Sequence, residues 1–237
     1  KTIKRKKKTV KIGIVGKYFD TGDFALADSY VSVIESIKHA CWHYNREPEI
    51  HWINSKTYEK SPHLVRELSK YDGIIIPGGF GKSGVEGKIK AVKYIREHKI
   101  PYPGLCYGLH MPVIQFARHV AGLKKAHTTE VAPRTPYPVI DILPEQKERL
   151  SKNEYGATMR LGDHKAILEK GTIVANAYSK NRVVERHRHR YEVNPKYIKK
   201  IEAAGLVFSG KSPNRRLMEF IELPKDKHPY FVATQAH

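Results

Sequence analysis

The nine residues Gly73-Ile-Ile-Ile-Pro-Gly-Gly-Phe-Gly81 indicate how this chain folds. A short, wholly apolar run that stops at proline and glycine is typical of a parallel strand buried on both faces. The segment that follows, 85–98, carries apolar residues at helical spacing, so an amphipathic helix succeeds the strand. A buried strand followed by a helix is the repeating unit of an α/β protein with a mostly parallel sheet.

The same alternation continues on both sides of this stretch. Strands are predicted at 11–16, 49–54 and 103–106, and helices at 28–44 and 108–120. Asp28 or Ser29 is placed to cap the first of these helices. We therefore expect an open, mostly parallel sheet with helices on both faces and with functional sites at the carboxyl ends of its strands.

The second half of the chain has a different pattern, with short apolar segments and one clear helix, at 195–204. Strands are predicted at 156–161, 172–175, 182–193, 206–209, 217–223 and 230–235. These segments predict either antiparallel strands added to the sheet or a small β subdomain.

Composition limits the classes of function. The chain has 237 residues, and 43 Lys and Arg against 24 Asp and Glu give a formal charge of +19. Such a charge favours a nucleic acid, a nucleotide or an acidic partner, but the basic residues are dispersed and form no known nucleic-acid motif, so no nucleic acid is expected. Two cysteines make no disulfide framework and no apolar run reaches the roughly 20 residues of a membrane span, which predicts a cytoplasmic protein without a membrane segment.

Cys106 is the strongest candidate for chemistry. It lies between a predicted strand and a predicted helix in Gly104-Leu-Cys-Tyr-Gly108, the Gly-x-nucleophile-x-Gly pattern of a nucleophile elbow. Small neighbours let the side chain project, a helix N-terminus favours a thiolate, and the Tyr107 N–H is left to face an oxyanion. A buried small hydrophobic residue is the alternative.

The glycine-rich segment 77–81 directly follows a buried strand, so it is expected at the same sheet edge as Cys106. Its glycines permit close backbone approach and can present N–H groups to an oxyanion, although an ordinary tight turn would look the same. It is not a phosphate-binding P-loop, because the Gly-x-x-x-x-Gly-Lys-Ser/Thr spacing is absent.

A thiol nucleophile needs a base, and the chain has 13 histidines. His237 follows the apolar strand at 230–235 and so is placed at that strand's carboxyl end; a frayed terminal residue is the alternative. His187 and His189 alternate with arginines and would share one face of a strand. A metal pair is conceivable there, but no third ligand supports it, and a solvated basic strand is favoured, with Arg190 able to bind a carboxylate through its guanidinium.

Taken together, these motifs resemble class I glutamine amidotransferases, and in detail the glutaminase domains of CTP synthases. The resemblance covers nearly the whole chain. Its most specific segment is Glu185-Arg-His-Arg-His-Arg-Tyr-Glu-Val-Asn194. The other segments are Gly13-Ile-Val-Gly-Lys-Tyr18, residues 28–40, residues 77–87, the Cys106 elbow and Phe231-Val-Ala-Thr-Gln-x-His237.

The resemblance implies a flavodoxin-like three-layer fold and a reaction. Cys106 would attack the side-chain amide of L-glutamine with His237 as general base, and a γ-glutamyl thioester would then be hydrolysed after ammonia leaves. The backbone at Gly79 and Tyr107 would form the oxyanion hole. The glutamine contacts implied are Gly79, Phe80, Tyr107, His110, Glu130 for the ammonium and Arg190 for the carboxylate.

Two positions differ from the family pattern. His110 stands where the family usually has glutamine, which bears on substrate contact. The family continues His-Pro-Glu, whereas this sequence ends at His237, so the carboxylate that would orient the imidazole is not in the sequence.

The resemblance also implies a domain organisation. Residues 1–10 are expected to be the remnant of a basic linker and residues 11–237 the amidotransferase domain, without the family's N-terminal amidoligase (synthase) domain. That domain would be the partner that uses ATP, Mg and UTP, and the full-length protein would be a homo-oligomer; no cofactor and no metal are expected in residues 11–237. The alternatives are a catalytically impaired regulatory or assembly module and a stand-alone γ-glutamyl hydrolase.

Overall fold

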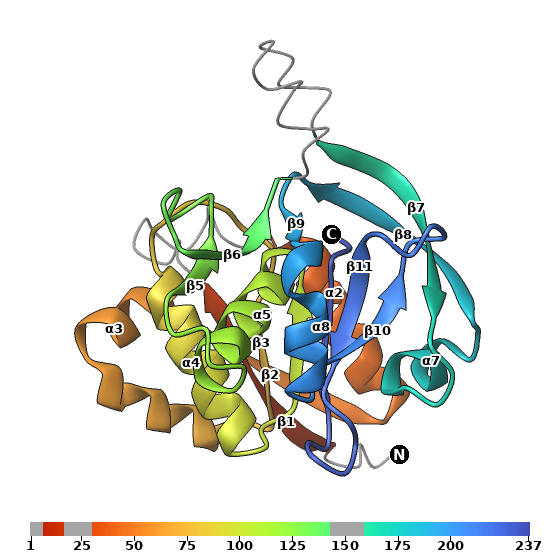
Figure 1. Cartoon of the computed structure of the whole chain (residues 1–237). Helices are drawn as coiled ribbons and strands as arrows, with labels where there is room; N and C mark the ends of the chain where they lie inside the picture. Colours follow the sequence, from red (N-terminus) through yellow and green to blue (C-terminus); the bar gives the residue numbers. More distant parts are fainter. Residues whose placement is uncertain (1–6, 17–29, 143–158) are drawn as a thin grey trace, which may run out of the picture.

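The computed structural model describes residues 7–16, 30–142 and 159–237 (Figure 1). Its strands are β1 (Lys8–Gly16), β2 (Arg46–Asn54), β3 (Gly73–Ile75), β4 (Tyr102–Leu105), β5 (Ala126–Thr128), β6 (Tyr137–Asp141), β7 (Arg160–Leu168), β8 (Arg182–His189), β9 (Glu192–Val193), β10 (Val207–Lys211), β11 (Met218–Glu222) and β12 (Phe231–Thr234). Its helices are α2 (Val31–His43), α3 (Ser55–Lys60), the 3₁₀ helix η1 (Pro62–Lys70), α4 (Val85–Glu97), α5 (Tyr107–His119), α7 (Ile173–Tyr178) and α8 (Pro195–Ala203).

A parallel sheet forms the centre of the molecule. β1 pairs in parallel with β2 and β3, and β4 pairs in parallel with β12. Backbone hydrogen bonds join β3 to β4, among them the bond from the Leu105 N–H to the Ile76 carbonyl at 2.9 Å. The parallel order is therefore β2-β1-β3-β4-β12, which confirms the open parallel sheet predicted from the first half of the chain.

The second half extends this sheet with antiparallel strands, which decides between the two predicted arrangements. β11, β10, β7 and β8 follow β12 in that order, each antiparallel to its neighbour. A separate small sheet contains β5, β6 and β9. In the part of the chain that the structure describes, β8 is the last strand of the large sheet, and the β7–β8 ribbon runs along its outer edge (Figure 1).

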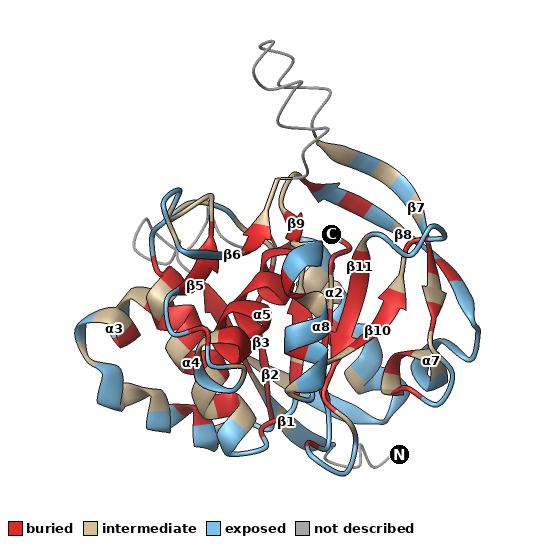
Figure 2. Ribbon diagram, in the orientation of Figure 1, coloured by how far each residue is buried: buried red, intermediate tan, exposed pale blue. Residues whose placement is uncertain are grey.

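Helices cover both faces of the parallel strands. On one face Ile37 of α2 packs against Ile14 and Ile75, and the partly buried Cys41 joins this cluster. On the other face Ile74 and Ile76 pack against α4 and α5 in the large core that Figure 2 shows as buried. Neighbouring isoleucines of one strand thus point to opposite layers, as the two-residue period of a strand requires.

The segment Thr172 to Ala175 is the clearest error of the sequence analysis, because it belongs to helix α7 and not to a strand. Thr172 caps the helix through its Oγ1, which accepts a hydrogen bond from the Ala175 N–H at 3.1 Å. The buried carboxylate of Glu222 accepts two more, from Ile173 N at 2.7 Å and Val174 N at 3.0 Å. A carboxylate supplied by a distant strand thus satisfies N–H groups that the local sequence leaves unpaired.

Other predicted boundaries shift. The segment predicted as one strand at 182–193 divides into β8 and β9, and β7 extends to Leu168, well beyond the predicted 156–161, of which 156–158 lie outside the described residues. The predicted caps Asp28 and Ser29 also lie outside them. Helices α3 and η1 and strands β5 and β6 were not predicted.

The Glu222 contacts with α7 can be tested by substitution. Glu222→Gln should lower the free energy of unfolding by about 2 kcal/mol, since an amide replaces a carboxylate that accepts two buried backbone hydrogen bonds. Glu202→Gln, at a partly exposed position on α8, should change it by less than about 0.5 kcal/mol. Urea unfolding of both variants measures the difference, and equal effects would show that Glu222 does not hold α7.

Candidate active site

Cys106 occupies a strained turn between β4 and α5. Its φ of 53° and ψ of −104° place a non-glycine residue outside the usual backbone regions. A Cβ on Gly104 would lie 2.4 Å from the Gly108 carbonyl oxygen, and one on Gly108 would lie 2.1 Å from that of Ile76. Only glycine fits on either side of the turn, which confirms the predicted elbow geometry.

The thiol of Cys106 faces strand β8. Its Sγ lies 3.9 Å from the Arg188 carbonyl oxygen, to which it donates. Burial raises the pKa of this thiol to about 12, and the carboxylates of Glu192 and Glu130 add to the effect, while a hydrogen bond from the Tyr107 backbone lowers it in part. The start of α5 thus favours the thiolate through the Tyr107 N–H, as predicted, but desolvation outweighs this effect and the net pKa is raised.

His237 lies beside the elbow. A Cβ on Gly78 would lie 3.0 Å from His237 Nδ1 and 3.7 Å from the Cys106 Cβ, so the imidazole and the cysteine flank the same glycine. The His237 backbone N–H donates to the Arg186 carbonyl at 2.8 Å, which attaches this residue to β8. Partial burial and the charge of Arg188 lower the pKa of the imidazole, so the ring is neutral at neutral pH.

The glycine-rich loop lies next to the same turn. The Gly81 N–H donates to Glu130 Oε1 at 2.7 Å, and the Tyr107 hydroxyl donates to the Gly81 carbonyl at 3.0 Å. A Cβ on Gly79 would come within 3.8 Å of the Tyr107 ring, whereas Phe80 leaves 69% of its surface exposed. The loop, the elbow and Glu130 are thus brought together, as predicted.

His110 is in the first turns of α5, but it points into the protein. It is buried, its Nε2 lies 3.2 Å from Gln235 Oε1, and its ring packs edge-on against Tyr107 at 5.6 Å between centroids. Burial lowers its pKa to about 4, so the ring is neutral. His110 thus contacts both the elbow residue Tyr107 and the segment that leads to His237.

Strand β8 divides its side chains as predicted, with the arginines outward and the histidines inward. His187 and His189 are buried, so the prediction of a solvated strand holds only for the arginine face. Within the described ranges no three His, Cys, Asp or Glu side chains form a metal site. Arg190 follows this strand, two residues beyond the carbonyl that contacts Cys106.

Sequence reasoning missed the charged residues behind this strand, Arg160, Glu192 and Glu219. The two glutamates are buried and share the guanidinium of Arg160. One signal was available: Met218-Glu-Phe-Ile-Glu222 places a carboxylate inside an apolar strand whose residues are all buried.

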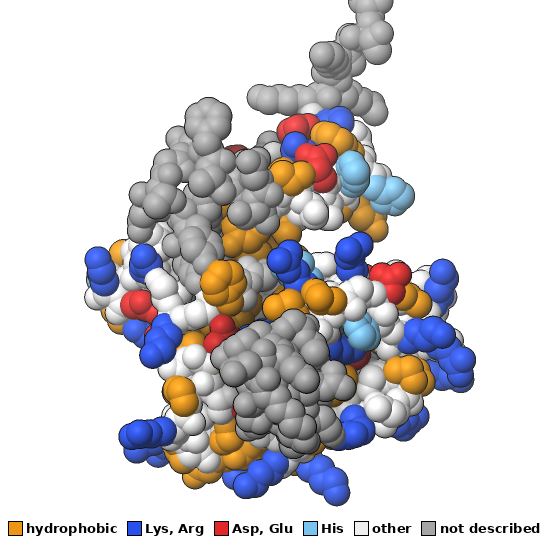
Figure 3. Space-filling model, turned by 90° about the horizontal axis from the view of Figure 1, so that it is seen from above, with side chains coloured by type: hydrophobic (Ala, Val, Ile, Leu, Met, Phe, Trp, Pro, Cys, Tyr) orange, Lys and Arg blue, Asp and Glu red, His pale blue; other side chains and the backbone are white. Residues whose placement is uncertain are grey.

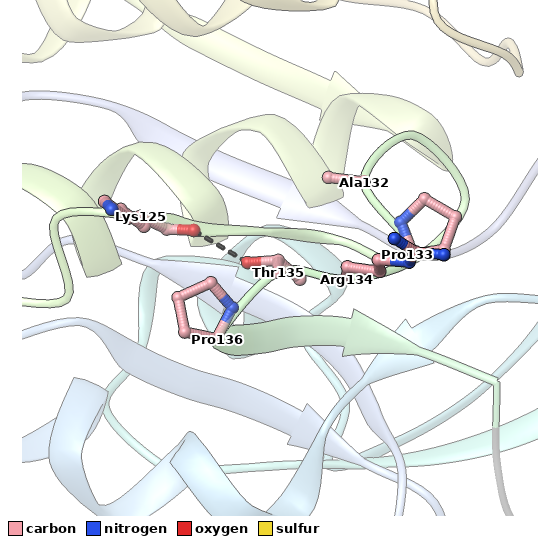
Figure 4. A pocket seen from close by; sticks show the side chains of 6 residues that line it. All are labelled: Lys125, Ala132, Pro133, Arg134, Thr135 and Pro136. Atoms are coloured by element: carbon pink, nitrogen blue, oxygen red, sulfur yellow. Dashed lines mark hydrogen bonds between the residues drawn. The ribbon is translucent and has the colours of Figure 1, made fainter.

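Two surface features of the described residues bear on where a ligand could bind: the distribution of basic side chains and a surface pocket. On the face in Figure 3, lysine and arginine side chains lie scattered over the surface and do not gather in one patch. A surface pocket of about 450 Å³ is lined by Lys125 and residues 132–136, where the Thr135 hydroxyl donates to the Lys125 carbonyl at 2.7 Å (Figure 4). This pocket contains none of the elbow residues.

No helix in the described ranges is long and apolar enough to cross a membrane.

Comparison with known proteins agrees with this geometry. Residues 25–237 match the family Glutamine amidotransferase class-I. Over 230 residues the chain is 50% identical to a CTP synthase of Pyrococcus furiosus, covering 97% of this chain and 41% of that protein. A CTP synthase of Carboxydothermus hydrogenoformans is 50% identical over 234 residues, 99% of this chain and 42% of the relative. The chain thus spans about two fifths of the length of these relatives.

A solved structure gives a closer match in length. The glutaminase domain of Trypanosoma brucei CTPS, solved with bound acivicin, superposes with a TM-score of 0.86 at 35% identity, covering 96% of this chain and 85% of that one. The chain belongs to the class I glutamine amidotransferases. Within that family it is homologous to the glutaminase domains of CTP synthases.

The glycines around the elbow should differ sharply in tolerance. Gly108→Ala should lower the free energy of unfolding by at least about 3 kcal/mol, because the added Cβ would meet the Ile76 carbonyl oxygen. Gly79→Ala should cost less than about 1 kcal/mol, because an added Cβ would lie no closer than 3.8 Å to Lys88 Nζ and to the Tyr107 ring. Chemical denaturation measures both, and a tolerated Gly108→Ala would contradict the described turn.

Proposed function

We propose that this chain hydrolyses L-glutamine to glutamate and ammonia through a γ-glutamyl thioester on Cys106. The observation that carries the proposal is the placement of Cys106 and His237 next to the same glycine, Gly78, with Cys106 on a strained elbow at the carboxyl ends of parallel strands. Homology to glutaminase domains of CTP synthases supports it.

The pKa values favour a concerted start to the reaction. A thiol with a pKa of about 12 is protonated at neutral pH, so its proton must leave as sulfur attacks. Neutral His237 accepts that proton while the S–C bond forms, and the backbone N–H groups at Gly79 and Tyr107 stabilise the oxyanion. The imidazolium then protonates the departing nitrogen, ammonia leaves, and water cleaves the thioester.

The ends of the substrate would be held by opposite charges. Glu130 is positioned beside the loop by its contact with Gly81 and would bind the α-ammonium group. Arg190 would bind the α-carboxylate through its planar guanidinium, Phe80 would cover the aliphatic stem, and His110 would support the pocket through Tyr107.

In the whole protein we propose that the ammonia aminates UTP to CTP in a synthase domain that uses ATP and Mg. The proposal rests on relatives that are CTP synthases more than twice as long as this chain. Residues 11–237 would be the glutaminase domain and residues 1–10 its linker, in a cytoplasmic homo-oligomer. The curated relatives favour this function over an impaired regulatory module or a stand-alone γ-glutamyl hydrolase.

Cys106 should be the residue that a glutamine-like electrophile labels. 6-Diazo-5-oxo-norleucine should modify Cys106 and leave Cys41 unmodified, because Cys41 packs against the α2 face of the sheet, away from the elbow. Peptide mass spectrometry of the wild type and of Cys106→Ala measures this. Labelling that persists in Cys106→Ala would remove Cys106 from the reaction.

Arg190 should control substrate affinity. Arg190→Ala should raise the KM for glutamine roughly 30- to 700-fold, the equivalent of about 2–4 kcal/mol for a lost pair of charge-assisted hydrogen bonds. Arg190→Lys should restore little of it, because an ammonium cannot form the paired contact. Arg182→Ala, at the exposed start of β8, is the matched control. An unchanged KM in Arg190→Ala would exclude this role.

A further inference from the structure

A buried ionic cluster lies behind the candidate active site. Arg160 of β7 donates to Glu192 Oε1 at 3.0 Å and to Glu219 Oε1 at 2.9 Å, so one guanidinium joins β9 to β11. Both carboxylates are almost completely buried, with side chains 1% exposed. Buried charges persist only where they are paired, so this cluster constrains the strands that carry it.

Strand β8 connects this cluster to the reactive pair. Two of its backbone carbonyl groups contact the reactive pair. The Arg186 carbonyl accepts a hydrogen bond from the His237 N–H, and the Arg188 carbonyl accepts one from the Cys106 thiol. Its inward side chains reach the cluster: His187 Nδ1 lies 3.8 Å from Glu219 Oε2, and His189 Nδ1 lies 3.6 Å from Glu192 Oε1.

The two histidines are neutral. Their rings meet through His187 Nδ1 and His189 Nε2 at 2.8 Å, and His189 Nδ1 lies 3.2 Å from the Tyr191 carbonyl oxygen. These contacts are satisfied when His187 Nδ1–H donates to His189 Nε2 and His189 Nδ1–H donates to Tyr191. Burial and the charge of Arg160 lower the pKa of both rings, that of His187 to about 3.

The single positive charge of Arg160 therefore faces the carboxyl groups of Glu192 and Glu219. The cluster is electrically neutral only if one of these two groups carries a proton. Glu192 is the place for it, because its Oε2 is buried without a hydrogen-bond partner in the described residues, which is costly for an anion. Burial raises the pKa of Glu192 to about 8. The groups that face the cluster from all sides are Arg160 and His164 of β7, His187 and His189 of β8, Glu219 of β11, and Cys106 and His110 at the start of α5.

We propose that Arg160, ionised Glu219 and protonated Glu192 form a neutral clamp that fixes β8 behind Cys106 and His237. Arg160 is then a positioning residue for the thiol. The inference deepens the proposed function and rests on it for the role of Cys106. The proton on Glu192 keeps a negative charge away from the sulfur, where it would oppose formation of the thiolate.

Two isosteric substitutions separate this clamp from a merely structural salt bridge. Glu192→Gln keeps a neutral side chain where a neutral one is proposed. Glu219→Gln removes the ionised partner, so Glu192 ionises against Arg160 and places its charge closer to Cys106. Arg160→Lys keeps the charge but cannot join both carboxyl groups. Arg96→Lys, at the far end of α4 where Arg96 bonds Gln115 and Glu97, is the control.

The measurement is the alkylation of Cys106 by iodoacetamide between about pH 6 and pH 10, read by mass spectrometry. Cys41 in the same molecule is the internal reference. Glu192→Gln should match the wild type within about threefold at pH 7. Glu219→Gln and Arg160→Lys should lower the alkylation rate of Cys106 about tenfold, which corresponds to a rise of about one unit in the pKa of its thiol. The alkylation rate of Cys41 should not change. Wild-type reactivity should rise less steeply above about pH 8, where Glu192 ionises, and Glu192→Gln should lack this bend.

Each outcome has one meaning. Equal losses of Cys106 alkylation rate in Glu192→Gln and Glu219→Gln would show that Glu192 does not carry the proton. Wild-type pH profiles of Cys106 alkylation in all three variants would refute the clamp. If Glu219→Gln exposes Cys41 by unfolding, the comparison of wild type with Glu192→Gln above pH 8 still decides. Iodoacetamide requires no glutamine, so a wild type that does not hydrolyse glutamine would refute the proposed function and leave the clamp to be judged by these profiles.

Discussion

The positive φ of Cys106 is the constraint on which the rest of the site depends. A cysteine at φ 53° and ψ −104° is held only because glycines on both sides let β3, β4 and α5 approach within backbone contact. The parallel sheet brings the Gly78–Gly81 loop to the same edge, and β12 brings His237 there from the far end of the chain. The order of the strands thus places the turn, the loop and the imidazole together at one edge of the sheet.

Burial sets the chemistry of this arrangement. The same packing that forces the thiol out of the elbow removes it from water and raises its pKa, while His237 is kept neutral. In the proposed mechanism a protonated thiol beside a neutral imidazole carries little thiolate at rest, so His237 and the oxyanion contacts promote the attack once a substrate is in place.

The sequence predicted the parallel half and its site because the signals there are local. Short apolar runs marked β1, β3 and β4, and the Gly-x-Cys-x-Gly spacing located the elbow. Helix α7 was mistaken for a strand because the carboxylate that satisfies its N–H groups belongs to Glu222, almost fifty residues later. The Arg160 cluster was missed for the same reason, since its three residues come from three different strands. The pKa of Cys106 depends on desolvation, which no local pattern reports.

The central claim is that Cys106 carries the γ-glutamyl group during turnover. A single turnover with glutamine, quenched rapidly in acid and followed by peptide mass spectrometry, tests it most directly. The account predicts a transient γ-glutamyl adduct on the peptide that contains Cys106, formed before glutamate appears and absent from the peptide that contains Cys41. Release of glutamate and ammonia at the full rate with no adduct on Cys106 at any time point would contradict it.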